Sequence, residues 1–273
     1  MAIWNYTSNS TDLVINYRDL YPNNERIVLL LHGLGVDSQS WVFQEKALGE
    51  AGFRPIVPDL PGFGSSTTIT REWSIENCAK ILYLFVREIT NKPVFLLGIS
   101  LGGAIELKML ADHPENFEKA ILINTFSKIR PEKFSSLLYL VTRLWKVIFL
   151  SIEDQAIFMA KRLFPSEVDA PYRDMIVKQI VNTDPRIYKQ TLYKISLLNL
   201  DNYLNPISTP CLMITGAEDS TILPKSQTAL AKKLHKCDQI FIQKAGHAVI
   251  VQQPDLVNRH ILEFISSGKH PNE

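Results

Sequence analysis

Apolar runs that alternate with helical periodicity predict strands and helices in turn along most of the chain. The runs "RIVLLLHG", "PVFLLG", "KAILINT" and "CLMITG" are apolar at nearly every position, which is typical of strands buried on both faces. Apolar residues recur at helical spacing over 74–90, 101–112, 225–234 and 255–266, and over a shorter stretch near 41–48. This alternation predicts an α/β fold with a mainly parallel central sheet that helices flank.

The N-terminal region predicts a β-hairpin. "AIWNYTS" and "DLVINYR" are strand-like and are separated by Asn9, Ser10 and Thr11. "RPIVPDL" and "DQIFIQ" predict two further strands. Ser74 is the expected N-cap of the helix over 74–90, because Glu76 and Asn77 occupy its first turn.

The alternation stops between residues 126 and 205, where no strand is predicted. Roughly four helices, divided near Pro165, Pro171 and Pro185, fit this stretch. We therefore expect a helical cap inserted at 126–205 between two strands of one sheet. Residues 1–125 and 206–273 would form one discontinuous core domain.

Composition restricts the class of protein. The 273 residues include 29 Lys and Arg against 28 Asp and Glu, and no basic tract points to a nucleic acid or an anionic membrane as partner. The run "FSSLLYLVTRLWKVIFL" is short for a membrane span and carries Arg143 and Lys146, so no stable membrane insertion is expected. The oligomeric state stays open.

The first residues and the cysteines indicate the compartment and bear on metal binding. The first residues, "MAIWNYTSNS", lack the basic and apolar regions of a secretory signal. Cys78, Cys211 and Cys237 lie far apart and are odd in number, which fits neither a disulfide framework nor a zinc site. We expect a cytoplasmic protein that binds no metal.

A serine lies between glycines where a predicted strand meets a predicted helix. Residues 98–102, "GISLG", match G-x-S-x-G, and this placement is what the motif requires. A sharp strand-to-helix turn would strain Ser100, require small residues two positions away on either side, and project the hydroxyl beside a helix N-terminus. Ser100 is therefore the candidate nucleophile.

A serine nucleophile needs a base and an acid that orients the base. Asp219 follows the strand "CLMITG", and His247 follows the last strand. Both would lie at carboxyl ends of parallel strands, where open α/β sheets place their sites. Glu218 is adjacent and stays open as the acid, although Asp219 fits the spacing to Gly216 and Pro224 better.

Two backbone N–H groups are candidates for an oxyanion hole. Leu101 follows the serine directly, and Leu34 lies in the glycine-rich loop "HGLG" after an earlier strand. We interpret His32 and Asp59 as structural residues of loops, and expect the Asp59 carboxylate to accept from nearby backbone N–H groups.

The chain resembles serine hydrolases of the α/β-hydrolase superfamily. The matching motifs are "HGLG" (32–35), "DLPGFGSS" (59–66), "GISLGG" (98–103), "GAEDSTILP" (216–224) and "AGH" (245–247), in the order and spacing of the family. Carboxylesterases and enol-lactonases are the nearer likeness. The resemblance implies an α/β-hydrolase fold, a variable cap that shapes substrate choice, and hydrolysis through an acyl-enzyme without a cofactor.

The reaction and the substrate are less closely defined by the residues. In the superfamily that the chain resembles, halide displacement and epoxide opening use an aspartate at this turn, so Ser100 argues against both. Esters, lactones, thioesters, amides and certain carbon–carbon bonds remain. We expect a small or medium ester with an apolar acyl group. Acyl transfer and a non-catalytic ligand-binding role stay as alternatives. Trp145, Phe149 and Phe158 would face either the pocket or the core.

A glycine-rich segment offers one competing interpretation. "GLGVDS" (33–38) approximates a dinucleotide-binding fingerprint. Its third position is Ser, it does not follow the first strand, and it leaves Ser100, Asp219 and His247 unexplained. We expect no nucleotide cofactor.

Overall fold

The central sheet has eight strands in the order β1-β2-β4-β3-β5-β6-β7-β8. The structure is a computed structural model that describes residues 1–8, 11–67, 73–129, 142, 145 and 149–267. The strands are β1 (Ala2–Ser8), β2 (Thr11–Arg18), β3 (Arg26–Leu31), β4 (Phe53–Pro58), β5 (Val94–Ile99), β6 (Phe117–Ile123), β7 (Cys211–Gly216) and β8 (Cys237–Ile242).

The sheet is parallel from β4 to β8 and antiparallel at its N-terminal edge. β1 pairs with β2, and β2 pairs with β4, in antiparallel register. The hairpin and the mainly parallel sheet are thus confirmed. The strand predicted to run to Thr125 ends earlier, at Ile123, because Asn124 adopts a left-handed backbone with φ 43°.

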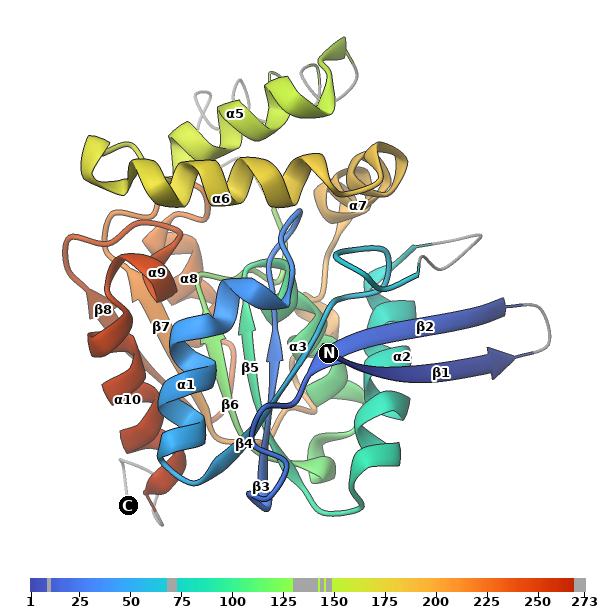
Figure 1. Ribbon diagram of the computed structural model, residues 1–273. Helices are drawn as coiled ribbons and strands as arrows, with labels where there is room; N and C mark the ends of the chain where they lie inside the picture. The colour runs from blue at the N-terminus through green and yellow to red at the C-terminus, as the bar shows by residue number, and fades with distance from the viewer. Residues whose placement is uncertain (9–10, 68–72, 130–141, 143–144, 146–148, 268–273) are drawn as a thin grey trace.

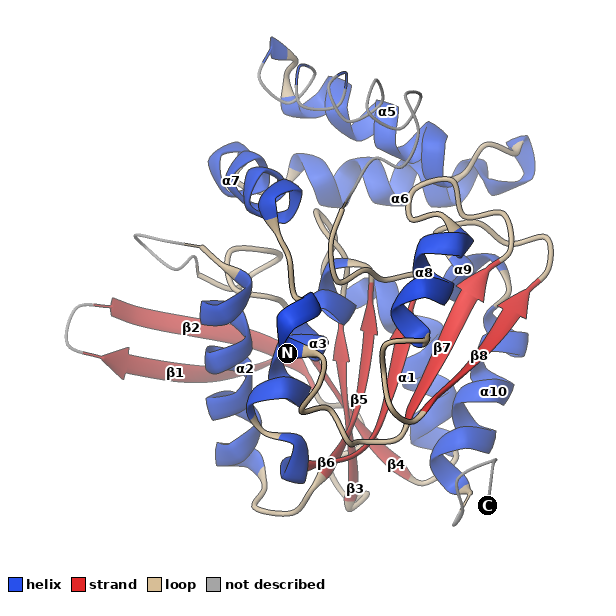
Figure 2. Ribbon diagram, turned by 180° about the vertical axis from the view of Figure 1, so that it is seen from behind, coloured by secondary structure: helices blue, strands red, loops and turns tan. Residues whose placement is uncertain are grey.

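Helices cover both faces of the sheet (Figures 1 and 2). Helices α1 and α10 lie on one face, and α2, α3 and α8 lie on the other. The helices outside the long segment between β6 and β7 are α1 (Val42–Glu50), α2 (Ile75–Ile89), α3 (Leu101–Asp112), α8 (Pro224–Ala231), α9 (Val249–Gln252) and α10 (Pro254–Ser266), with 3-10 turns at Ser38–Trp41 and Pro114–Asn116.

Local signals explain several helix ends. The Ser74 hydroxyl accepts a hydrogen bond from Asn77 N at 3.1 Å, so the predicted N-cap of α2 is confirmed. Helix α8 ends at Ala231, before the predicted Leu234. There, the N–H groups of Lys233 and Leu234 bond three residues back instead of four, which tightens the last turn.

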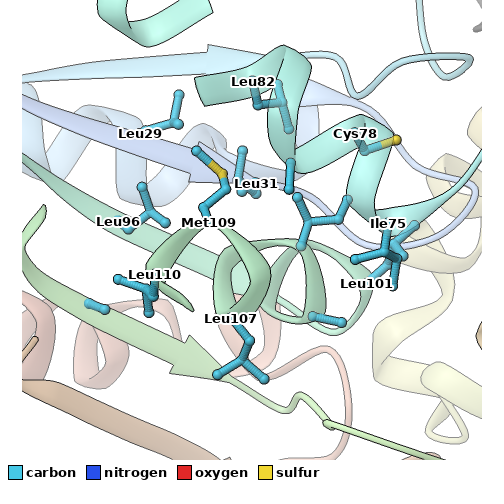
Figure 3. Packing of buried hydrophobic residues seen from close by; sticks show 14 of the residues in the cluster. Leu29, Leu31, Ile75, Cys78, Leu82, Leu96, Leu101, Leu107, Met109 and Leu110 are labelled. Atoms are coloured by element: carbon cyan, nitrogen blue, oxygen red, sulfur yellow. The ribbon is translucent and has the colours of Figure 1, made fainter. Parts of the chain in front are cut away.

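Alternate residues of β3 feed two separate apolar cores. Leu29 and Leu31 belong to the core beneath α2 and α3, whereas Val28 and Leu30 belong to the core beneath α1 and α10. Figure 3 shows the first of these cores, where side chains of α2 and α3 pack against β3 and β5. Burial on both faces explains why β3 is apolar from Ile27 to Leu31.

The described part of the chain between β6 and β7 is mainly helical and lies over the carboxyl ends of the parallel strands (Figure 1). It contains α5 (Ile152–Leu163), α6 (Ala170–Val181) and α7 (Pro185–Leu197), with 3-10 turns at Glu167–Asp169 and Asp201–Tyr203. Asp184 caps α7 by accepting from Arg186 N at 2.8 Å. Most of the further helix predicted before α5 lies outside the described residues. Among the described helices, none is long and apolar enough to cross a membrane.

Candidate functional site

Ser100 lies at the junction of β5 and α3 in a strained backbone conformation. Its φ is 53° and its ψ is −113°, a combination that a residue with a side chain rarely adopts. Two hydrogen bonds hold the turn: Ser100 N donates to Ile123 O at 2.9 Å, and Thr125 Oγ1 donates to Ser100 O at 2.7 Å. The sharp turn predicted from the motif is therefore present.

The glycines on either side of Ser100 are required by close packing. A Cβ atom on Gly98 would lie 2.6 Å from Gly102 C, and one on Gly102 would overlap the carbonyl oxygen of Leu31. Real Cβ atoms do not approach other atoms so closely. Without side chains at these positions, α3 can begin directly against β3 and β5.

Asp219 and His247 come together across the ends of β7 and β8. His247 Nδ1 lies 2.8 Å from Asp219 Oδ2. Asp219 Oδ1 accepts from the backbone N–H groups of Thr221 and Ile222 at 2.8 and 3.0 Å. Glu218 is exposed, and of the two acids it is Asp219 that contacts His247.

These contacts orient the imidazole. A carboxylate only accepts hydrogen bonds, so Nδ1 of His247 carries the proton in this pair. The His247 side chain is 11% exposed and the Asp219 side chain is fully covered. His247 and Ser100 line the same cavity, which leaves Nε2 as the ring nitrogen that can exchange a proton there.

The loop after β3 lies against Ser100. A Cβ atom on Gly33 would be 3.7 Å from Ser100 Cβ, and Gly33, Leu34 and Leu101 all line the cavity with Ser100. Gly35 has φ 75°, and a Cβ atom there would come within 2.7 Å of the Tyr188 ring. The N–H of Leu101 belongs to the first turn of α3, where such groups have no partner within the helix.

His32 and Asp59 support loops, as expected from the sequence. The fully buried His32 accepts from Leu60 N at Nε2 (2.9 Å) and has Nδ1 2.8 Å from Gly33 O. This pattern needs a neutral ring, and burial lowers the pKa of His32 accordingly. Asp59 accepts from the backbone N–H groups of Ser38 and Ser65, both at 2.8 Å.

A largely apolar cavity of about 430 Å³ lies between the strand ends and the helices above them. Its walls include Leu34, Ile99 and Ile250 from the core, and Met159, Ile176 and Leu192 from α5, α6 and α7. Among the described residues, no Asp or Glu lines it. The two lining cations have partners: Lys128 pairs with Asp201, and Arg162 donates to Ser220 O.

The three aromatic residues that could have faced the pocket do not line it. Trp145 is 54% exposed and Phe149 is 66% exposed, and their ring centroids lie 5.2 Å apart. Phe158 is half-buried and is also absent from the cavity wall.

Two buried amides near the site were not found by sequence reasoning. Gln227 of α8 and Asn124 after β6 are fully buried, and Gln227 Nε2 donates to Asp219 Oδ2 at 3.1 Å. Neither belongs to a motif that marks chemistry. Their contacts with the site form only when β6, β7 and α8 pack together in the folded protein.

Known proteins resemble the chain over nearly its whole length. The alpha/beta hydrolase fold family matches residues 26–254. The monoacylglycerol lipase abhd6-A of Xenopus laevis is 26% identical, over 92% of this chain and 80% of its own. An esterase from Thermogutta terrifontis has a TM-score of 0.83 and 23% identity, covering 97% of this chain and 98% of its own. The enol-lactonase of Burkholderia xenovorans LB400 has a TM-score of 0.84 and 22% identity, covering 96% and 100%.

The family match and the lipase relative support hydrolase activity in general terms. The two solved structures support the fold. The strand order, the mainly parallel sheet and the family match agree with one another. The chain belongs to the alpha/beta hydrolase fold family.

Proposed function

We propose that the protein is a serine hydrolase that cleaves a small or medium, largely apolar carboxylic ester or lactone through an acyl-enzyme on Ser100. One observation carries the proposal. Ser100 is held in a strained turn on the wall of the cavity that His247 also lines, and Asp219 holds His247 by a 2.8 Å contact.

In this mechanism, His247 Nε2 takes the proton of Ser100 as the hydroxyl attacks the carbonyl carbon. Asp219 keeps the proton on Nδ1 and stabilises the imidazolium that forms. The N–H groups of Leu34 and Leu101 bind the oxyanion, and such donors contribute about 2.7–4 kcal/mol each. His247 then protonates the leaving alkoxide, and a water that His247 activates releases the acid.

The cavity supports the choice of substrate. Apolar walls stabilise an acyl chain by about 0.8 kcal/mol for each buried methylene, and no acidic residue among those described lines the cavity to attract a cationic substrate. Residues 126–205 act as a cap in this proposal, because α5, α6 and α7 supply the outer wall over a core formed by 1–125 and 206–273.

A fluorophosphonate probe followed by intact-mass measurement tests the nucleophile. The wild-type protein is expected to gain one adduct and Ser100→Ala none. The matched control is Ser196→Ala. Ser196 lies on α7 and its hydroxyl donates to Tyr193 O at 2.7 Å, so this variant should keep the adduct. Ester turnover should fall by about four powers of ten or more in Ser100→Ala.

The outcomes separate the alternatives. A folded wild-type protein without an adduct, and without turnover of p-nitrophenyl esters or lactones, would contradict the proposal in favour of a ligand-binding role. Ester formation from an added alcohol, in preference to free acid, would identify an acyltransferase.

A further inference from the structure

A chain of hydrogen-bonded side chains runs behind Asp219 from the edge of the sheet. Gln239 of β8 donates from Nε2 to Thr215 Oγ1 at 2.9 Å, and Thr215 donates to Gln227 Oε1 at 2.9 Å. Gln227 Nε2 then donates to Asp219 Oδ2 at 3.1 Å. Thr215 and Gln227 are both fully buried, so water does not replace these contacts.

The hydrogen bonds around the Gln227 amide fix its orientation. A hydroxyl has one proton. Because Thr215 Oγ1 already accepts from Gln239, its own proton is free for Gln227 Oε1. Because Ile222 O can only accept a hydrogen bond, the NH₂ group of Gln227 must face it and Asp219, and the Thr215 proton holds Oε1 in this orientation. The same nitrogen donates to Ile222 O at 2.8 Å, which ties α8 to the loop that carries Asp219.

Asn124 joins this chain to the loop of His247. Its Nδ2 donates to the carbonyl oxygens of Gly246 and His247 at 3.0 and 2.9 Å. Its Oδ1 accepts from Gly216 N at 2.8 Å and lies 3.3 Å from Gln227 Nε2, whose two protons face Ile222 O and Asp219 at shorter distances. One buried amide thus spans the ends of β6 and β7 and the loop after β8.

We propose that Gln227 is a positioning residue of this site, with its amide oriented by Thr215 and braced by Asn124. The proposal rests on the proposed function, because it assigns Gln227 the task of holding the acid that holds the base. Gln227 and His247 donate to the same oxygen, Asp219 Oδ2. Loss of the Gln227 donor would leave that oxygen free to turn, and His247 with it.

The effect should fall on the chemical step and not on binding. Gln227 does not line the cavity, so KM in Gln227→Met should stay within about threefold while kcat falls by about 10- to 100-fold, the scale expected for a misplaced catalytic group. Thr215→Val removes only the group that orients the amide. We expect a smaller loss of kcat from it, in the same direction.

A second readout needs no substrate. The Nδ1–H proton of His247 should give a low-field proton NMR resonance whose position reports its hydrogen bond to Asp219. This resonance should move or broaden in Gln227→Met and move less in Thr215→Val. The matched control is Gln44→Met: Gln44 is also fully buried, and its amide donates to Ile250 O and Asn258 Oδ1, both at 3.0 Å.

The two readouts distinguish the failure of this inference from the failure of the proposed function. If Gln227→Met is folded and both kcat and the resonance match wild type, Gln227 does not position Asp219. If Gln44→Met changes them equally, the effect is a general loss of packing and the inference is wrong. If wild type neither hydrolyses esters nor binds the probe, the proposed function fails, and the resonance alone decides the positioning role. If Gln227→Met does not fold, Thr215→Val decides it.

Discussion

Glu106 places a carboxyl group in the apolar interior behind Ser100. The residue is fully buried on α3, and a Cβ atom on Gly98 would lie 2.5 Å from its Oε2. Burial raises the pKa of Glu106 well above its ordinary value of 4.5, and the backbone N–H groups of Ile121 and Gly98 offset only part of this. Burial therefore favours the neutral form of Glu106 in the folded protein.

This burial makes stability depend on pH. Above pH 4.5 the unfolded chain releases the Glu106 proton while the folded chain retains it, so the folded state loses stability relative to the unfolded state as pH rises. Glu106→Gln keeps the shape and cannot ionise. Above pH 4.5, and as long as folded Glu106 keeps its proton, the free energy of unfolding of wild type should fall by up to about 1.4 kcal/mol per pH unit relative to that of Glu106→Gln.

Urea unfolding of both proteins at pH 5 and pH 9 measures the difference. Glu118→Gln on β6, where the side chain is exposed, is the control and should follow wild type at both values. Equal pH dependence in wild type and Glu106→Gln would show that Glu106 ionises freely in the folded protein.

A single site residue can be predicted from the sequence when its position depends on residues close to it along the chain. Ser100, Asp219 and His247 could be selected because each follows a recognisable strand, and strand ends of a parallel sheet meet at one edge. Gln227 could not, because its contact with Asn124 joins residues 103 positions apart, and no periodicity encodes which polar helix residue will face a distant loop.

At the scale of elements, the start of α3 depends on one glycine. Gly102 lies where the helix crosses β3, and a Cβ atom there would overlap Leu31 O and come within 2.8 Å of His32 O. These are backbone atoms of the last residue of a central strand and of the residue that follows it, so neither can move aside without disturbing the sheet. The helix therefore reaches its position only with hydrogen in place of a side chain.

Gly102→Ala should consequently destabilise the protein by about 3 kcal/mol or more, or prevent folding, which exceeds the usual cost of overpacking. Gly246→Ala is the matched control. Its nearest atom would be 3.6 Å away, an ordinary contact, so its free energy of unfolding should stay within about 1 kcal/mol of wild type. Chemical denaturation of the three proteins provides the comparison. Similar stability of all three would mean that α3 tolerates displacement from β3.

Strands and helices could be predicted from the sequence where their pattern of buried residues is regular and long enough to recognise. The strands β3, β5, β6 and β7 were expected from their apolar runs, because strands buried on both faces leave few polar positions to confuse the pattern. The strands β1, β2, β4 and β8 were expected from other strand-like stretches. The short helix α9, with four residues, was missed, since one turn is too short to show a period of 3.6 residues. The cavity wall was missed as well: helical periodicity could not tell Met159, which lines the cavity, from Phe158, which does not.

At the scale of the whole molecule, the cavity exists only where two parts of the chain meet. Ser100 and His247 come from strand ends, whereas Met159, Ile176 and Leu192 come from helices between β6 and β7. Contacts such as Gln179 Nε2 to Asp37 Oδ1, at 2.8 Å, hold the helices to the core. Under the proposed function, the space available to an acyl chain is therefore set by side chains of the helices as well as by those at the strand ends.

Filling this space should change acyl-chain preference without removing the chemistry. Met159→Trp adds bulk on the cavity wall of α5, so the ratio of kcat/KM for p-nitrophenyl octanoate over acetate should fall at least about tenfold, the lower end of what one methylene is worth in a tight pocket. Ile157→Trp is the control, because Ile157 lies on the same helix but is 46% exposed and absent from the cavity wall. It should keep the wild-type ratio. An unchanged ratio in folded Met159→Trp, or an equal fall in both variants, would mean that the acyl chain binds elsewhere and that the helices between β6 and β7 do not select it.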